Sequence, residues 1–258
     1  MKSIRFGTIH ADYITMPETL KHLEQLAKSG TGGFVVTPNI DHVVIAQKNP
    51  ALRDAYTDAS LSLVDGMPLK WMSAAVGEPL PEKISGSDLI RPLLRHAAQK
   101  GLGAYFLGAA PGVARMAADK LTGEIPNLNI VGVDSPPLGF EKDPQREQAV
   151  IDKMVAAKPS FVLVALGCPK QELLMHKWSK TTQSIVYLGI GASLDFIAGK
   201  VQRCPPWMSA MGIEWLYRLK QEPTRMAKRY LIQDSAIAPV FLKMLRADKK
   251  DLIFERNV

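Results

Sequence analysis

The residues with the clearest chemical potential follow short apolar runs that are typical of buried strands. Asp65-Gly66 comes directly after the apolar run Leu61–Val64, and Thr37-Pro38-Asn39 follows another such run. The carboxyl ends of parallel strands open into the ligand crevice of an α/β sheet, so the Asp65 carboxylate is placed where it can meet a ligand. An aspartate before a glycine and Pro68 is also a common helix cap. The residues by themselves leave both interpretations open.

Other strand ends carry further candidate ligand groups. In Gly167-Cys168-Pro169-Lys170-Gln171-Glu172, the last three residues could bind a polar ligand, and Asp195 follows the next strand. Gly108-Ala109-Ala110-Pro111-Gly112 lies between a strand and a helix, where backbone N–H groups form a natural phosphate or nucleotide site. It lacks the Gly-Lys-Ser/Thr ending of a Walker loop. Leu194 replaces the third glycine of a dinucleotide fingerprint, which argues against a nicotinamide oxidoreductase.

Arginine, rather than a metal ion, is the expected partner of a diphosphate in this chain. No Asp-x-Asp triplet is present to hold Mg²⁺ or Mn²⁺, and the histidines lack zinc-ligand spacing. A guanidinium matches phosphate oxygens with two parallel hydrogen bonds. Candidates lie near the C-terminus: Arg203, Arg218, Arg225 and Arg229. The alternative is a solvated run of charge.

Apolar runs alternate with helical patterns over the first 200 residues, which predicts βαβ units. The fold class is therefore α/β, a Rossmann-like and largely parallel sheet with helices on both faces. Strands are expected at Gly33–Thr37, Leu61–Val64, Ala104–Leu107, Asn129–Val133, Phe161–Leu166 and Ile185–Ile190, and helices at Pro17–Ser29, Ser87–Lys100, Val113–Thr122, Gln145–Ala157 and Lys170–Lys180. We also expect a small antiparallel edge over residues 3–15 and a mobile loop at Gly77–Pro81.

The chain changes character after Gly199, which predicts a catalytic domain over residues 1–199 and a basic helical appendage over 200–258. Of the net charge of +7, the appendage carries +6, with 12 Lys and Arg against 6 Asp and Glu. Trp207, Met211, Trp215 and Leu219 recur on one face of a predicted helix. That face suits core packing, a membrane surface or a contact between copies in a homo-oligomer, and these remain open.

Composition restricts the class of protein. An apolar content of 47% provides a packed core, and two cysteines do not suggest a disulfide framework. The N-terminus lacks an apolar signal-peptide core, and no run is long enough to span a membrane, so a cytoplasmic location is expected. The basic tail contains no recognised nucleic-acid-binding module, so nucleic acid is not an expected partner.

Six segments, taken in order, resemble the WecG/TagA/CpsF family of bacterial glycosyltransferases. They are Thr37-Pro38-Asn39, Val64-Asp65-Gly66, Ser85-Gly86-Ser87-Asp88, Leu166-Gly167-Cys168-Pro169-Lys170-Gln171-Glu172, Asp195-Phe196-Ile197-Ala198-Gly199 and Gly212-Ile213-Glu214-Trp215-Leu216-Tyr217-Arg218-Leu219. Each segment alone is weakly specific, whereas all six in this order are strongly specific. The resemblance covers residues from about 30 to 230.

The resemblance implies a metal-independent, inverting transfer from a UDP-sugar to a polyprenyl-diphosphate-linked sugar at the cytoplasmic face of the inner membrane, with no cofactor. It implies that Asp65 is the general base that deprotonates the acceptor hydroxyl. The other residues that it implies for substrate binding are Thr37, Asn39, Lys83, Asp88, Gly108, Gln171, Asp195, Arg218, Arg225 and Arg229.

Departures from the family pattern concern the donor. Ala192-Ser193 replaces part of a glycine-rich stretch, and Lys83 stands where an arginine is expected. Family members use N-acetylmannosamine-type UDP-sugars or glucose, so the transferred sugar stays open. The competing hypothesis is a non-catalytic, nucleotide-binding membrane adaptor, which turnover of a UDP-sugar would exclude.

Overall fold

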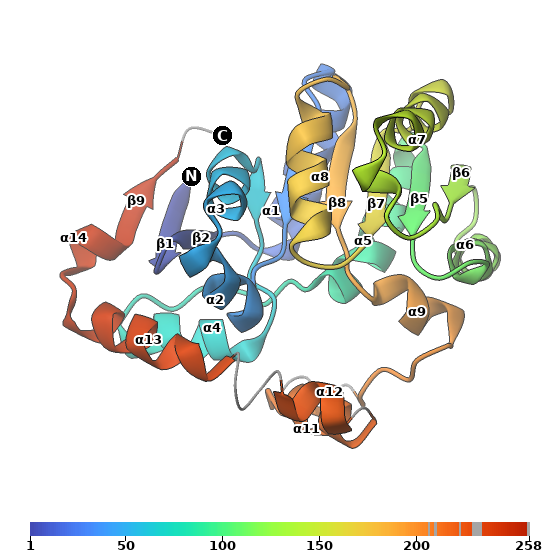
Figure 1. The fold of residues 1–258 in the computed structure, drawn as a ribbon. Helices are drawn as coiled ribbons and strands as arrows, with labels where there is room; N and C mark the ends of the chain where they lie inside the picture. The colour runs from blue at the N-terminus through green and yellow to red at the C-terminus, as the bar shows by residue number, and fades with distance from the viewer. Residues whose placement is uncertain (206, 209–210, 222, 229–233, 257–258) are drawn as a thin grey trace. The chain divides into compact units, whose positions relative to one another are not determined.

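The computed structural model describes residues 1–205, 207–208, 211–221, 223–228 and 234–256 (Figure 1). The chain forms two compact units, each assembled from discontinuous stretches. Unit 1 comprises Met1–Thr15, Val36–Ser85 and Arg203–Val258, and unit 2 comprises Met16–Val35 and Gly86–Gln202.

Unit 2 is built on parallel strands in the spatial order β3-β8-β7-β5-β6. Their bounds are β3 Gly33–Val36, whose last residue belongs to unit 1, β5 Ala104–Gly108, β6 Ile130–Asp134, β7 Phe161–Ala165 and β8 Val186–Gly189. In register, Ala104 of β5 pairs with Phe161 of β7, and Phe161 pairs with Val186 of β8. All residues of β5 and β7 are buried, as expected for strands that are covered on both faces.

Helices cover this sheet. They are α1 Met16–Ser29, α5 Gly86–Lys100, α6 Val113–Glu124, η1 Phe140–Lys142, α7 Pro144–Ala156, α8 Lys170–Ser179 and α9 Ser193–Ala198. Figure 1 shows α7 and α8 in front of the strands, with α1 and α5 behind them. The sequence encodes the ends of these helices locally; Asp143, for example, caps α7 by accepting hydrogen bonds from the N–H groups of Gln145 and Arg146.

Unit 1 contains β4 and an antiparallel sheet in the order β2-β1-β9. The strands are β1 Lys2–Phe6, β2 Ile9–Asp12, β4 Leu61–Ser62 and β9 Ile253–Glu255; the helices are α2 Ile40–Lys48, α3 Pro50–Asp58, α4 Met67–Ala75, α11 Glu214–Gln221, α12 Pro223–Lys228, η3 Asp234–Ala236, α13 Ile237–Arg246 and α14 Lys249–Leu252. Just after β4, Leu63 N–H donates to Val36 O at 2.9 Å, within unit 1. With β4, the parallel sheet has six strands, in the order β4-β3-β8-β7-β5-β6.

The C-terminal end of the chain is part of the N-terminal sheet. Phe254 of β9 pairs with Ser3 of β1. Arg256 Nη1 donates to both carboxylate oxygens of Asp12, each at 3.1 Å. Residues 253–256, the last that the structure describes, are therefore bound to the first residues of the chain.

The α/β class is confirmed, and each strand and helix that was predicted within the first 200 residues is present, most within one or two residues of its expected bounds, although β4 covers only Leu61–Ser62. The antiparallel edge at residues 3–15 is also confirmed, although β9 was not predicted. The segment Gly77–Pro81 is a loop, in which Glu78 accepts hydrogen bonds from Lys2 at 2.8 Å and Lys249 at 3.2 Å. Among the described residues, no helix has both the length and the apolar character that crossing a membrane requires.

The expected single helix that carries Trp207, Met211, Trp215 and Leu219 on one face is wrong. Met211 and Gly212 form a turn, and α11 begins only at Glu214. Gly212 has φ +71°, in the left-handed region, which cannot continue a right-handed helix.

Candidate active site

Backbone hydrogen bonds fix Asp65 just beyond β4. Asp65 N–H donates to Pro38 O at 2.8 Å, which aligns the two strand ends that the sequence singled out. On the other side, Ile84 N–H donates to Val64 O at 2.9 Å and brings the segment with Lys83 alongside. Three stretches that are separate in sequence therefore meet at Asp65.

Asp65 does not occupy the cap position of the helix that follows it. The N-cap of α4 is Gly66, with φ +112°, and no side chain forms a capping hydrogen bond there. The turn at Gly66 needs a conformation that glycine adopts readily and other residues rarely adopt. Asp65 is therefore not the N-cap residue of α4, and its role toward a ligand stays a prediction.

Asn39 both caps a helix and lies at the strand end next to Asp65. Its side-chain oxygen caps α2 by accepting a hydrogen bond from His42 N–H at 3.3 Å. Capping fixes the side chain at the strand end. Thr37, two residues earlier, is buried, with 6% of its surface exposed.

Gly212 places α11 against α4. A Cβ atom at Gly212 would lie 2.4 Å from Trp71 Cη2 and 2.8 Å from Met67 Cβ, so only glycine permits this approach. Because Glu214 follows two residues later as the first residue of α11, this contact sets where the helix begins.

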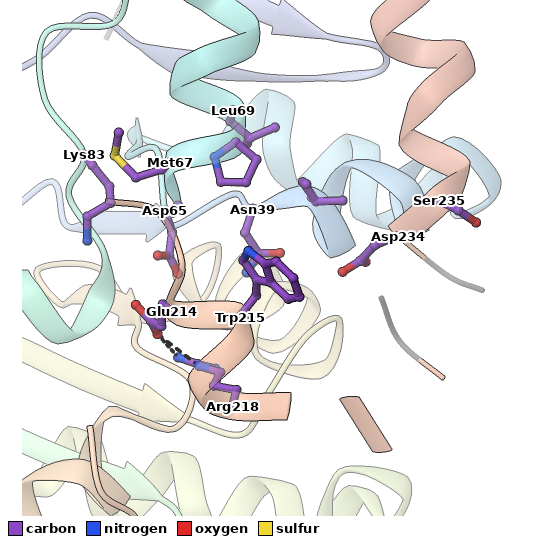
Figure 2. Close-up of a pocket in the computed structure, with 14 residues that line it drawn as sticks. Asn39, Asp65, Met67, Leu69, Lys83, Glu214, Trp215, Arg218, Asp234 and Ser235 are labelled. Atoms are coloured by element: carbon purple, nitrogen blue, oxygen red, sulfur yellow. Dashed lines mark hydrogen bonds and ion pairs between the residues drawn. The ribbon is translucent and has the colours of Figure 1, made fainter. Parts of the chain in front are cut away.

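Strand-end loops, α11 and η3 line a partly open cavity of about 390 Å³ within unit 1. It is lined by Asn39, Ile40, Asp65, Gly66, Met67, Pro68, Leu69, Lys83, Gly212, Glu214, Trp215, Arg218, Asp234 and Ser235. Figure 2 shows Asp65 and Asn39 reaching in from the strand-end side, opposite Glu214, Trp215 and Arg218 of α11. The volume lies within the range of small-molecule sites.

Arg218 and Glu214 form an ion pair in this cavity. Arg218 Nε and Nη2 donate to Glu214 Oε1 at 3.0 and 2.6 Å, and the two side chains are 36% and 30% exposed. The fork of a guanidinium that binds a carboxylate can also bind a phosphate. Among the described residues that line this cavity, the two cationic side chains are Arg218 and Lys83.

Cys204 is buried close to the same charges. Burial, followed by the Glu214 carboxylate, raises the pKa of its thiol, against the opposing effect of Arg203 and Arg218. A thiol with a raised pKa stays protonated at neutral pH and is a poor nucleophile. Cys204 is therefore a packing residue.

Gln171, in unit 2, is 2% exposed and links two strand ends. Its Oε1 accepts hydrogen bonds from the N–H groups of Gly167 and Gly191, both at 3.2 Å, and its Nε2 donates to Glu172 Oε1 at 2.8 Å. The side chain thereby joins the loop after β7 to the loop after β8. Its predicted role in substrate binding stays a prediction.

Asp88 and Asp195 lie in the first turns of α5 and α9, within unit 2. The hydroxyl oxygens of Ser87 and Ser193 are 2.8 Å apart, so the two helix starts are neighbours. Burial raises the pKa of Asp195, although a backbone hydrogen bond opposes the shift.

Gly108 ends β5 with φ +102°, and a Cβ atom there would lie 2.4 Å from Ala165 O. The loop that follows reaches α6 at Gly112, which has φ +81° and forms no side-chain cap. The close packing of β5 against β7 explains this glycine without a ligand, and its predicted nucleotide contact is untested.

Of the three remaining candidate arginines, Arg203 is not among the residues that line the cavity. Arg225 belongs to α12, but its side chain is not among those described, and Arg229 lies outside the described residues.

The structure therefore brings Asn39, Asp65, Lys83 and Arg218 to one cavity, with Thr37 buried close by in sequence. Sequence reasoning missed Glu214, Trp215, Asp234 and Ser235. The first two lie in a segment that carried the family resemblance, so a signal existed; Asp234 and Ser235 had none.

The chain is similar to known proteins over most of its length. The profile described as "Glycosyl transferase WecG/TagA/CpsF family" matches residues 4–251. A protein of Bacillus spizizenii, named N-acetylglucosaminyldiphosphoundecaprenol N-acetyl-beta-D-mannosaminyltransferase, is 34% identical over 232 residues, 90% of this chain and 87% of its own length. A protein of Bacillus subtilis with the same name is 31% identical over 224 residues, 86% of this chain and 83% of its own.

Proposed function

Because this chain belongs to the WecG/TagA/CpsF family of glycosyltransferases, we propose that it transfers a sugar from a UDP-sugar to a polyprenyl-diphosphate-linked sugar, with inversion and without a metal ion. The observation that carries the proposal is that Asp65 and Arg218 line the same cavity. One supplies a carboxylate for a proton, and the other supplies a fixed positive charge.

Asp65 acts as the general base. The acceptor hydroxyl oxygen forms a bond to the anomeric carbon of the donor sugar while the bond from that carbon to the diphosphate oxygen breaks. The hydroxyl proton passes to Asp65, and the electron pair of the broken bond leaves with UDP. Attack from the face opposite UDP inverts the anomeric configuration. This chemistry requires the carboxylate within hydrogen-bond reach of the acceptor hydroxyl.

Arg218 stabilises the departing diphosphate. Its Nε and Nη2 groups donate to Glu214, and this ion pair orients the guanidinium within the cavity. Preorganised positive charge at the position where negative charge develops lowers the barrier. Lys83, on the strand side of the cavity, adds a second cation, and Arg225 and Arg229 complete the predicted set.

The acceptor is a lipid diphosphate that carries an N-acetylglucosaminyl group, and the donor is an N-acetylmannosamine-type or glucose UDP-sugar. Both Bacillus proteins are named for the transfer of an N-acetylmannosaminyl group to N-acetylglucosaminyldiphosphoundecaprenol, which supports this acceptor and the first of the two donors. Thr37 and Asn39 bind the reacting sugars, and Asp88, Gly108, Gln171 and Asp195 serve the donor side.

Contact with the cytoplasmic face of the membrane goes through α13. Val240 and Met244 of this helix are buried, whereas Leu242 and Leu245 are 51% and 48% exposed beside basic residues in the last turn. Exposed apolar side chains next to lysine and arginine suit the interface of an anionic bilayer.

Donor screening tests the proposal. The full chain is incubated with UDP-N-acetylmannosamine, UDP-N-acetylglucosamine or UDP-glucose and a short-chain polyprenyl-diphospho-N-acetylglucosamine, and the product is identified by mass spectrometry. We expect transfer from one donor, with inversion by NMR and an unchanged rate in EDTA. No transfer from any donor, retained configuration, or loss in EDTA that Mg²⁺ restores would each contradict a stated part.

A further inference from the structure

Trp215 is an exposed tryptophan that lines the cavity with Asp65. Its side chain is on the first turn of α11 and has 45% of its surface exposed. Trp71 and Trp207 are 49% and 58% exposed, and neither lines the cavity. Exposure alone is common for apolar residues, so the distinguishing feature of Trp215 is its location among polar and charged groups.

Contacts on either side of Trp215 in the chain fix the first turn of α11, and so they fix the position of the indole. Gly212 packs on Trp71 and Met67 of α4 at distances that only glycine permits. One turn further along α11, Arg218 is held by Glu214. Trp215 lies between these two contacts in the chain.

The chemistry around the indole matches a sugar ring. One face of a pyranose presents C–H groups and its rim presents hydroxyl groups. A flat indole takes the apolar face, because a rigid aromatic surface gives a large contact area at low entropic cost. The rim hydroxyls need hydrogen-bonding groups nearby, and Asn39, Asp65 and Glu214 line the same cavity.

A membrane contact is the competing explanation for an exposed tryptophan. Figure 2 shows the Trp215 indole among the cavity-lining side chains, on the side of α11 that also carries Arg218. Trp215 lines this partly open cavity of about 390 Å³, whose volume suits a small ligand such as a sugar better than a bilayer.

We propose that Trp215 is a sugar-binding residue that stacks on a pyranose ring in the reacting complex. This inference rests on the proposed glycosyl transfer. It assigns to Trp215 a role in the affinity of the enzyme for one of its two sugar substrates.

The variant Trp215→Ala tests this proposal. It is assayed with water-soluble short-chain substrates, without vesicles or detergent. We expect KM for one of the two sugar substrates to rise about 10-fold or more, with kcat changed much less. Trp215→Phe and Trp215→Tyr should restore most of the affinity, because they keep an aromatic face. The substrate whose KM rises identifies the stacked sugar. The matched control is Trp207→Ala, which should leave both KM values unchanged.

Unchanged KM values for both substrates in Trp215→Ala would overturn the inference while leaving the proposed function intact. So would an effect that appears only with a long-chain acceptor in vesicles, since that result indicates a membrane contact. Calorimetric binding of the UDP-sugars and of the short-chain acceptor to both proteins gives a readout without turnover. Wild-type protein that neither turns over nor binds any of these sugars would overturn both proposals.

Discussion

Two aspartates of unit 1 each share a cluster with an arginine from the C-terminal segment, and they differ in burial. The Asp12 side chain is 0% exposed and accepts hydrogen bonds from Ser3 Oγ and Ser62 N–H, both at 2.7 Å, as well as from Arg256. Asp65 is partly exposed and lines a cavity with Arg218. The first cluster is saturated within the fold, whereas the second opens to a space the size of a ligand.

The comparison separates charge that holds the chain together from charge that can act on a substrate. A buried ion pair contributes little net stability over an apolar pair, yet losing one partner is costly because the other charge is left buried. A partly exposed pair such as Arg218–Glu214 is worth about 1 kcal/mol or less to folding, so its arginine can exchange partners. Substitutions in the two clusters should therefore move different measurements.

The largest effect is expected at Asp65. Asp65→Asn keeps the shape of the side chain but cannot accept the acceptor proton, so kcat should fall about 10³-fold. The free energy of unfolding, measured in urea, should change by less than about 1 kcal/mol. Turnover near the wild-type rate would remove Asp65 as the base, and a large loss of stability would move it into the structural class with Asp12.

Arg256→Ala should show the opposite pattern. It leaves the buried Asp12 carboxylate without its ion-pair partner, so the free energy of unfolding should fall by about 3 kcal/mol. Below the unfolding transition, kcat should stay at the wild-type value. Arg256→Lys, which keeps the charge, should recover part of the stability. A stability loss under about 1 kcal/mol in the alanine variant would contradict a structural role for the Asp12–Arg256 ion pair.

Arg256 also decides how the C-terminal segment can be tested. A truncation after Gly199 would delete Arg218, but it would also delete β9 and Arg256 and so expose β1 and Asp12. Loss of activity in that truncate would follow from unfolding of unit 1 as readily as from loss of a diphosphate contact. Point substitutions are therefore required.

Arg218→Ala is the matched substitution in the cavity. Loss of one preorganised donor at the leaving group should lower kcat/KM for the UDP-sugar about 10²-fold, with unfolding in urea almost unchanged. Arg218→Lys should recover less than half of this loss on a logarithmic scale, because an ammonium lacks the fork. Equal activity of the lysine variant and the wild type would show that simple charge suffices.

The sequence predicted the parallel sheet because buried parallel strands are continuous apolar runs. The strand β9 could not be predicted in this way, since Ile253–Glu255 is short and its partner β1 is at the other end of the chain. Asp65 was found from its strand-end position. The alternative interpretation, that Asp65 is the N-cap of the next helix, could not be excluded from the sequence because the start of α4 after Gly66 was not known.

The cavity face of α11 was less predictable. An i, i+4 pattern starting at Trp207 assumed one uninterrupted helix, and the turn at Gly212 shifts the register of all that follows. Asp234 joins the lining only through tertiary folding, for which the local sequence holds no pattern.

His10, whose Nε2 lies 3.9 Å from Asp12 Oδ1, gives the smallest and most specific test of the Asp12 cluster. It is 6% exposed, and burial, reinforced by the nearby Arg256 and Arg5 charges, lowers its pKa to about 4 against the opposing effect of Asp12. The unfolded chain binds this proton below about pH 6.5, whereas the folded chain binds it only near pH 4, so the stability that neutral His10 provides is present above pH 6.5 and is lost as the pH falls. Between pH 7 and pH 5 the loss should be about 2 kcal/mol.

The measured quantity is the difference in free energy of unfolding between the wild type and His10→Gln, in urea at the two pH values, because protonation of carboxylates elsewhere also lowers stability in acid. The glutamine variant should lose that much less stability on acidification; an identical loss in both proteins would place the acid sensitivity outside the Asp12 cluster.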